Sequence, residues 1–71
     1  MIGIIIRPDR ADYSADDLRE AVQVLHNANV AIIKAARDNA GRTVVTVPNS
    51  SGDTALAALN KAGIPARKED S

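Results

Sequence analysis

The sequence contains no cysteine, phenylalanine or tryptophan, and only one tyrosine and one histidine. Without cysteine, neither a disulfide nor a Cys-based zinc site supports the fold. Because aromatic side chains are nearly absent, the core has to be built from Ile, Val, Leu and Ala. The 71 residues make a single domain, 1–71, near the size at which one core is barely sufficient. We therefore expect association with a partner to add stability.

Excess charge and long apolar runs are also missing. Nine basic and nine acidic residues cancel, so no global field attracts nucleic acid or an anionic membrane. The opening apolar run, Ile2–Ile6, is far shorter than the roughly 20 residues of a membrane-spanning helix. A lone histidine cannot build a His-rich metal site, and no catalytic pair is apparent. We expect a cytoplasmic protein that is not an enzyme and has no cofactor or metal.

Four segments have the composition of β-strands. Ile2–Ile6 is apolar on both faces, which is typical of a central strand. Thr43–Val47 is β-branched throughout and predicts a second central strand. Segment 30–36 precedes it after a short turn, so the two should form an antiparallel hairpin. Segment 64–68 predicts a last strand, which Pro65 and its charges confine to an edge.

Two helices separate these strands. Ser14 and Asp17 have the spacing of a reciprocal capping box, and apolar residues then recur at helical spacing, which predicts a helix over 14–27. Ser50 and Asp53 repeat the capping-box spacing at the start of a second helix, which ends at a glycine suited to a left-handed stop.

The element order β-α-β-β-α-β predicts an α+β fold of the ferredoxin-like type. Right-handed crossovers place both helices on one face of a four-stranded antiparallel sheet with strand order 4-1-3-2. This order puts the two most apolar strands in the centre and the proline-bearing strand at an edge.

The face without helices should keep several aliphatic side chains. Because side chains alternate along a strand, we assign Ile5, Ile33, Val44 and Thr46 to an interface. Burying a contiguous apolar patch of this kind favours association, so we expect a homo-oligomer. The alternative is that these aliphatic side chains are scattered and need no partner.

A charged segment precedes the first helix. It contains Arg7, Asp9, Arg10 and Asp12. Two guanidinium groups and free helical amides would hold a carboxylate, while an aspartate would receive an ammonium group. The alternative is a solvated loop whose charges neutralise one another.

Two phrases resemble the ACT family of small regulatory domains. A strand, Thr43–Val47, leads through Asp53 to a helix ending in Leu59-Asn-Lys-Ala-Gly-Ile64, and Leu25-His-Asn-Ala-Asn-Val30 resembles the family's exit from its first helix. ACT domains are ferredoxin-like, generally assemble through their sheets, and often bind an amino acid. The resemblance adds Asn29 to the candidate ligand residues through its side-chain amide.

Three functional hypotheses remain open at this point. The first is an ACT-like regulatory module that forms homo-oligomers through its sheet and senses an amino acid or a similar zwitterion. The second is an assembly or scaffold protein that uses the same sheet face without a ligand. In the third, the domain regulates another polypeptide, so that its partner is a different chain.

Overall fold

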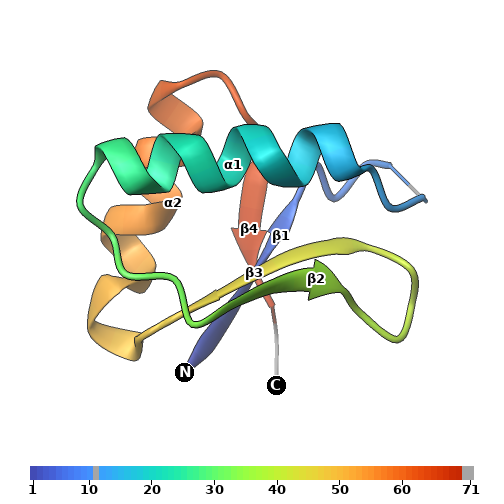
Figure 1. Cartoon of the computed structure of the whole chain (residues 1–71), viewed down its shortest axis with the longest axis horizontal. Coiled ribbons are helices and arrows are strands. Elements are labelled where there is room, and N and C mark those ends of the chain that lie inside the picture. Colours follow the sequence, from blue (N-terminus) through green and yellow to red (C-terminus); the bar gives the residue numbers. More distant parts are fainter. Residues whose placement is uncertain (11, 70–71) are drawn as a thin grey trace.

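The computed structural model describes residues 1–10 and 12–69, which form one sheet and two α-helices (Figure 1). Their order is β-α-β-β-α-β, as predicted, with a short 3₁₀ turn before the second helix. The elements are β1 Ile2–Ile6, α1 Ala15–Asn27, β2 Lys34–Arg37, β3 Thr43–Val47, η1 Asn49–Ser51, α2 Gly52–Lys61 and β4 Ala66–Lys68.

The sheet is antiparallel throughout and confirms the predicted fold class. Its order, β2-β3-β1-β4, is the expected 4-1-3-2 read from the opposite edge. In the centre, Ile4 of β1 lies opposite Val45 of β3. At the edges, Ile4 lies opposite Lys68 of β4 and Val45 lies opposite Ala35 of β2.

Both helices pack on the same face of the sheet (Figure 1). The buried core joins alternate residues of β1 and β3 to one stripe of each helix. Its members are aliphatic, as the composition requires, and most have no solvent-exposed surface. The core consists of Ile4, Ile6, Ala21, Leu25, Val30, Val45, Val47, Ala55, Leu59 and Ile64.

Strand β2 is shorter than predicted and begins later, at Lys34 instead of residue 30. Asn29 has a left-handed backbone, φ 60°, that sends Val30 down into the core. The Ile33 N–H then donates to Thr46 O at 2.8 Å, although Lys34 is the residue aligned with Thr46. This extra residue on one strand has the character of a β-bulge. Residues 30–33 therefore connect α1 to the sheet and are not part of the strand. The alternation of side chains in the sequence does not reveal this connection.

The two helices end in the same way. Val30 N–H donates to Leu25 O at 3.0 Å, and Ile64 N–H donates to Leu59 O at 2.9 Å. Each is the 6→1 bond of a Schellman motif, with the apolar residue after the stop buried in the core. The left-handed residue is Asn29 after α1 but Gly63 after α2. The same turn delays pairing in both edge strands, so β4 begins at Ala66 instead of residue 64.

Neither capping box forms as predicted. Ser14 does accept from the Asp17 N–H at 3.2 Å, but its own N–H donates to Thr43 Oγ1 at 3.1 Å. The Asp17 carboxylate is engaged elsewhere, as described below. At α2, the 3₁₀ turn displaces the start of the helix, and its N-cap Ser51 makes no side-chain capping bond. Asp53 pairs with Lys68 of β4 instead.

Candidate functional site

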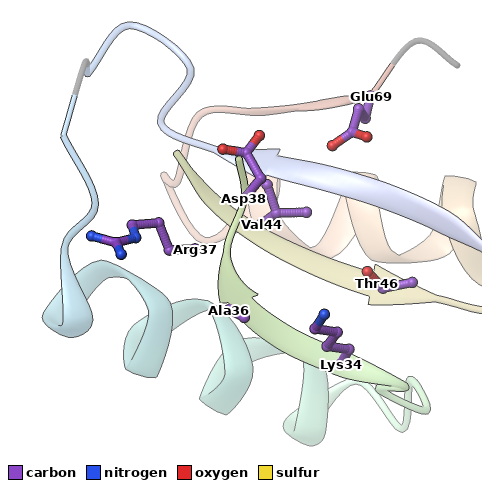
Figure 2. Close-up of a pocket in the computed structure, with 7 residues that line it drawn as sticks. All are labelled: Lys34, Ala36, Arg37, Asp38, Val44, Thr46 and Glu69. Atoms are coloured by element: carbon purple, nitrogen blue, oxygen red, sulfur yellow. The ribbon is translucent and has the colours of Figure 1, made fainter. Parts of the chain in front are cut away.

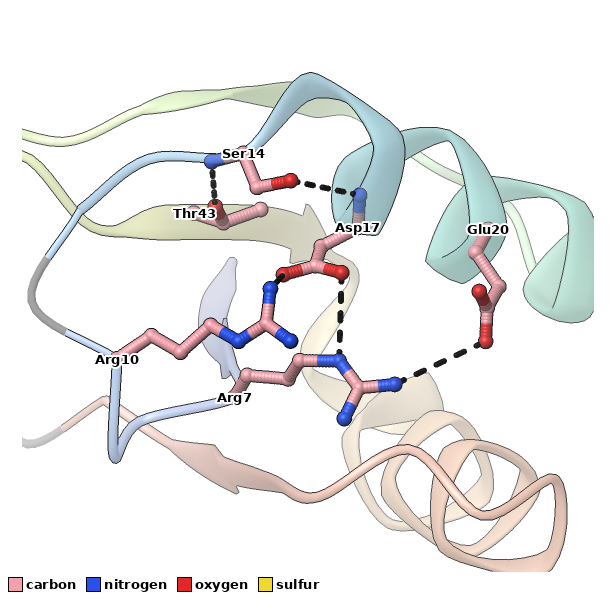
Figure 3. Close-up of polar contacts among 6 residues, drawn as sticks. All are labelled: Arg7, Arg10, Ser14, Asp17, Glu20 and Thr43. Atoms are coloured by element: carbon pink, nitrogen blue, oxygen red, sulfur yellow. Dashed lines mark hydrogen bonds and ion pairs between the residues drawn. The ribbon is translucent and has the colours of Figure 1, made fainter.

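The arginines of the predicted ligand loop converge on a carboxylate of the chain itself (Figure 3). Arg7 Nε lies 3.3 Å from Asp17 Oδ1, and Arg10 Nη1 lies 2.8 Å from Asp17 Oδ2. Arg7 Nη2 also lies 4.0 Å from Glu20 Oε1. The Asp17 side chain is only 11% exposed, so the two cations compensate a carboxylate that is largely withdrawn from water. The cluster is balanced without a ligand.

Arg7 is also held by its backbone. It has a left-handed conformation, φ 50°, which is uncommon for a residue with a side chain. Its N–H donates to Pro65 O at 2.7 Å, and its carbonyl accepts from Arg10 N–H at 2.9 Å. These bonds, together with the pair to Asp17, fix the turn from β1 toward α1. They account for the conformation without an added ligand.

The other predicted ligand residues lie apart from this pair. Asp9 and Asp12 are exposed. Asn29 lies beyond the far end of α1, which at 13 residues separates it from the arginines by roughly 20 Å. The five residues therefore do not line one cavity in the described part of the chain.

The open face of the sheet is organised in two cross-strand rows. The registers place Lys34, Thr46 and Gly3 side by side, and Glu69 N–H donates to Gly3 O at 2.8 Å. The neighbouring row consists of Ala36, Val44, Ile5 and Arg67. One row is thus polar with opposite charges at its two ends, and the other is aliphatic with a cation at one end.

The predicted interface residues fall into two groups. Ile5 and Val44 lie opposite each other at the centre of the open face, with Thr46 nearby. Their exposed fractions are only 2% for Ile5 and 9% for Val44. Ile33 precedes β2 and is 49% exposed. The open face therefore presents less apolar surface than the sequence predicted, because longer polar side chains flank its aliphatic centre.

A shallow hollow of about 170 Å³ lies on this face (Figure 2). Lys34 and Glu69 lie on opposite sides of Thr46, and neither forms an ion pair within the described residues. Gly3 leaves room for the Glu69 side chain, because a Cβ at position 3 would lie 3.2 Å from Glu69 Oε2. The lining residues are Lys34, Ala36, Arg37, Asp38, Val44, Thr46 and Glu69.

Asp38 closes the hairpin that carries β2. Its carboxylate accepts from the backbone N–H groups of Ala40 and Arg42 at 2.9 and 2.8 Å, and from Arg42 Nε at 2.9 Å. The bond from the Arg42 backbone N–H is the main reason why the pKa of Asp38 lies below its ordinary value. The side chain therefore remains a carboxylate near neutral pH and anchors the end of the edge strand.

The two edges of the sheet leave backbone groups unpaired. Asp38 N–H donates to Arg42 O at 2.9 Å. Because bonded pairs alternate along an antiparallel ladder, Ala35 and Arg37 point their N–H and C=O groups away from β3. On β4, the bond from Glu69 N–H to Gly3 O turns the groups of Ala66 and Lys68 outward by the same alternation. Edge groups of this kind are templates for pairing with another strand.

Of the residues around the hollow, the sequence singled out only Val44 and Thr46, and it assigned them to an interface and not to a ligand site. Lys34 and Glu69 belong to different edge strands, and only the register places both beside Thr46. Alternation within each predicted strand would have placed Lys34 and Ala36 on one face. It does not reveal which distant residues share that face.

Metal-binding clusters and membrane-spanning helices are both absent from the described residues. No group of three or more His, Cys, Asp or Glu side chains is placed to hold a metal ion. Neither helix among these residues combines the length and apolar character needed to cross a membrane.

The comparisons with known proteins give no family assignment. No protein-family model matches the chain, and neither the curated proteins nor the solved structures contain a significant match.

Proposed function

We propose that this chain is a small, non-catalytic, cytoplasmic module that associates with a second copy of itself through its sheet. The observation that carries the proposal is the open β2 edge, where Ala35 and Arg37 present unpaired backbone groups beside an uncovered sheet face. The exposed Ile33 adjoins the same edge. A domain with so small a core gains stability when its folded form binds a partner.

Light scattering over a concentration series tests this proposal. Self-association predicts a mass that rises from about 7.5 kDa toward twice that value as the protein is concentrated. A mass that stays at the monomer value up to millimolar concentration would reject it. A monomer that becomes a heterodimer only in the presence of another polypeptide would favour the third hypothesis, in which the partner is a different chain.

An ACT-like regulatory role is the second candidate, and the hollow on the open face is what favours it. A zwitterion carries a carboxylate and an ammonium group, and Lys34 and Glu69 offer an opposite charge to each. Thr46 lies between them as a hydroxyl donor and acceptor. An amino acid bound there would be a natural effector for a sheet-based assembly.

The predicted Arg7–Arg10 loop gives less support to ligand binding, because both arginines already pair with Asp17. This observation favours the alternative of an assembly protein without an effector. The two candidates differ in a thermal-shift screen with the proteinogenic amino acids. A regulatory module predicts a rise in melting temperature with a subset of them, whereas a scaffold predicts no response.

Matched variants locate any ligand that the screen finds. Lys34→Gln and Glu69→Gln should each remove the response if the hollow is the site. Arg10→Gln tests the loop predicted from the sequence, because the Arg10 side chain is 55% exposed and Arg7 still pairs with Asp17 in the variant. A response lost only in Arg10→Gln would transfer the site to that loop.

A further inference from the structure

We infer that two copies of the chain join β2 to β2 in antiparallel orientation, about a two-fold axis that passes beside Ala36. The inference rests on the proposed self-association and names the surface and the register through which it occurs. The partner is a second copy of this chain. The result is a continuous sheet in which β2 is an interior strand of the pair.

The register follows from the direction of the backbone groups. Ala35 and Arg37 point their N–H and C=O groups outward from β2. When Ala36 lies opposite Ala36 of the second copy, Ala35 faces the second copy's Arg37, and Arg37 faces its Ala35. Each of these two pairs exchanges two hydrogen bonds, which gives four in all. If the pairing were shifted by two residues, either Ala35 or Arg37 would face a residue outside β2 of the second copy.

The side chains agree with this register. On the open face, Lys34 lies opposite Asp38 of the second copy, and the symmetry repeats the contact. Both are positions without mutual backbone bonds, where side chains approach most closely. Asp38 accepts three hydrogen bonds within its own chain, and Arg42 Nη2 lies 2.8 Å from its Oδ2. The carboxylate is therefore already paired with Arg42, and Lys34 of the second copy would approach it as a second cation. At the axis, Ala36 is small enough to allow close approach.

The other edge does not support the equivalent pairing. The outward residues of β4 are Ala66 and Lys68, so bringing both into register places Arg67 opposite Arg67 of the second copy. Like charges directly opposite each other are unfavourable. Pro65 also lacks an N–H and shortens the strand that β4 offers. The difference in charge and length selects β2 as the pairing edge.

A disulfide tests the register directly, because the chain contains no cysteine that would compete. The proposal predicts that Ala36→Cys forms a covalent dimer in a glutathione redox buffer, since the two Cα atoms would lie about 4.5 Å apart. Arg67→Cys is a stringent control, because it occupies the corresponding position on the open face of β4 and also removes the like charges that oppose β4 pairing in the native chain. Non-reducing electrophoresis should show at least tenfold more covalent dimer for Ala36→Cys than for Arg67→Cys.

The outcomes separate this inference from the proposed function. Equal, low crosslinking of both variants, in a protein that light scattering shows to be dimeric, overturns the β2 pairing but leaves self-association standing. Preferential crosslinking of Arg67→Cys, with little covalent dimer of Ala36→Cys, also overturns the inference. A protein that stays monomeric overturns both the β2 pairing and the proposed self-association. Circular dichroism of each variant verifies that the cysteine has not disrupted the fold.

Discussion

The two edges of the sheet are built alike and yet offer different surfaces. Each edge strand follows a helix that ends in a Schellman motif, and each turns two residues outward. On the open face of β2, Ala36 lies between Lys34 and Asp38, which directly follows the strand and pairs with Arg42. β4 has Arg67 at its centre, is one residue shorter, and begins next to Pro65. Side-chain charge therefore decides which of two similar backbones is suited to pairing.

The two faces of the sheet show a related difference. The helix-covered face is a continuous aliphatic core, whereas on the open face Ile5 and Val44 are buried among longer polar neighbours. The apolar surface available to a partner there is small. Because the open face offers so little apolar surface, we expect the contact with a second copy at the β2 edge and not on the face of the sheet.

The largest expected effect comes from a proline on the pairing edge. Arg37→Pro removes an outward N–H but no bond of the β2–β3 ladder, because the Arg37 N–H points away from β3. By symmetry, two of four intermolecular bonds are lost. At about 1 kcal/mol each, this loss raises the dissociation constant about thirtyfold or more.

The matched control is Lys68→Pro, which removes an outward N–H from β4. Sedimentation velocity should show weakened association for Arg37→Pro and unchanged association for Lys68→Pro. The comparison between the edges fails if both variants associate as the native chain does, or if Lys68→Pro has the larger effect.

A charge reversal gives the next largest effect. Lys34→Glu would place a carboxylate opposite Asp38 of the second copy in two symmetric contacts, and we expect about tenfold weaker association in low salt. The effect should shrink as salt is added, because Lys34 is exposed. Arg67→Glu is the control and should not weaken dimers measured by fluorescence anisotropy. Equal weakening by both variants would point to general electrostatics instead of the β2 register.

The residue with a left-handed backbone before each edge strand can be exchanged for the one at the other edge, glycine for Asn29 and asparagine for Gly63. Asn29→Gly should stabilise the fold by about 0.5–1 kcal/mol, because glycine adopts positive φ without steric cost. Gly63→Asn should destabilise it by a similar amount, and an added Cβ at Gly63 would meet no atom within 4 Å. Urea denaturation measures both changes. Changes of the same sign in the two variants would contradict the equivalence of the two turns.

The smallest effect is a pH dependence confined to the β2 side. The pKa of Asp38 is lowered in the folded protein, so its contribution to stability is present above the unfolded pKa, near about 4, and is lost as the pH falls through the folded pKa. Asp38→Asn should therefore be less stable than the native chain at pH 7, and the difference should narrow below about pH 4. Denaturation midpoints at several pH values measure this. A constant difference for Asp38→Asn would rule out the ionised carboxylate as the cause.

Much of the fold could be predicted because local signals and global topology agree. The apolar run of β1 and the β-branched run of β3 identified the two central strands, and Pro65 identified an edge strand. The start of β2 could not be predicted. Asn29 and Ile33 form a turn and a bulge whose geometry depends on the core and on β3.

The candidate site was harder to predict than the fold. Arg7 and Arg10 were recognised as a charged pair, but their shared partner Asp17 lies in the first turn of α1, where the sequence indicated only a capping residue. Lys34 and Glu69 are separated by 35 residues in the chain and are connected only by the sheet register. Contacts that depend on register require the assembled sheet.

Amide hydrogen exchange followed by NMR at rising protein concentration tests the β2 edge most directly. The N–H groups of Ala35 and Arg37 should exchange rapidly in dilute solution and become protected as the dimer forms, while those of Ala66 and Lys68 stay rapid throughout. Protection that rises at Ala66 and Lys68, or at neither edge while the mass doubles, would contradict the account.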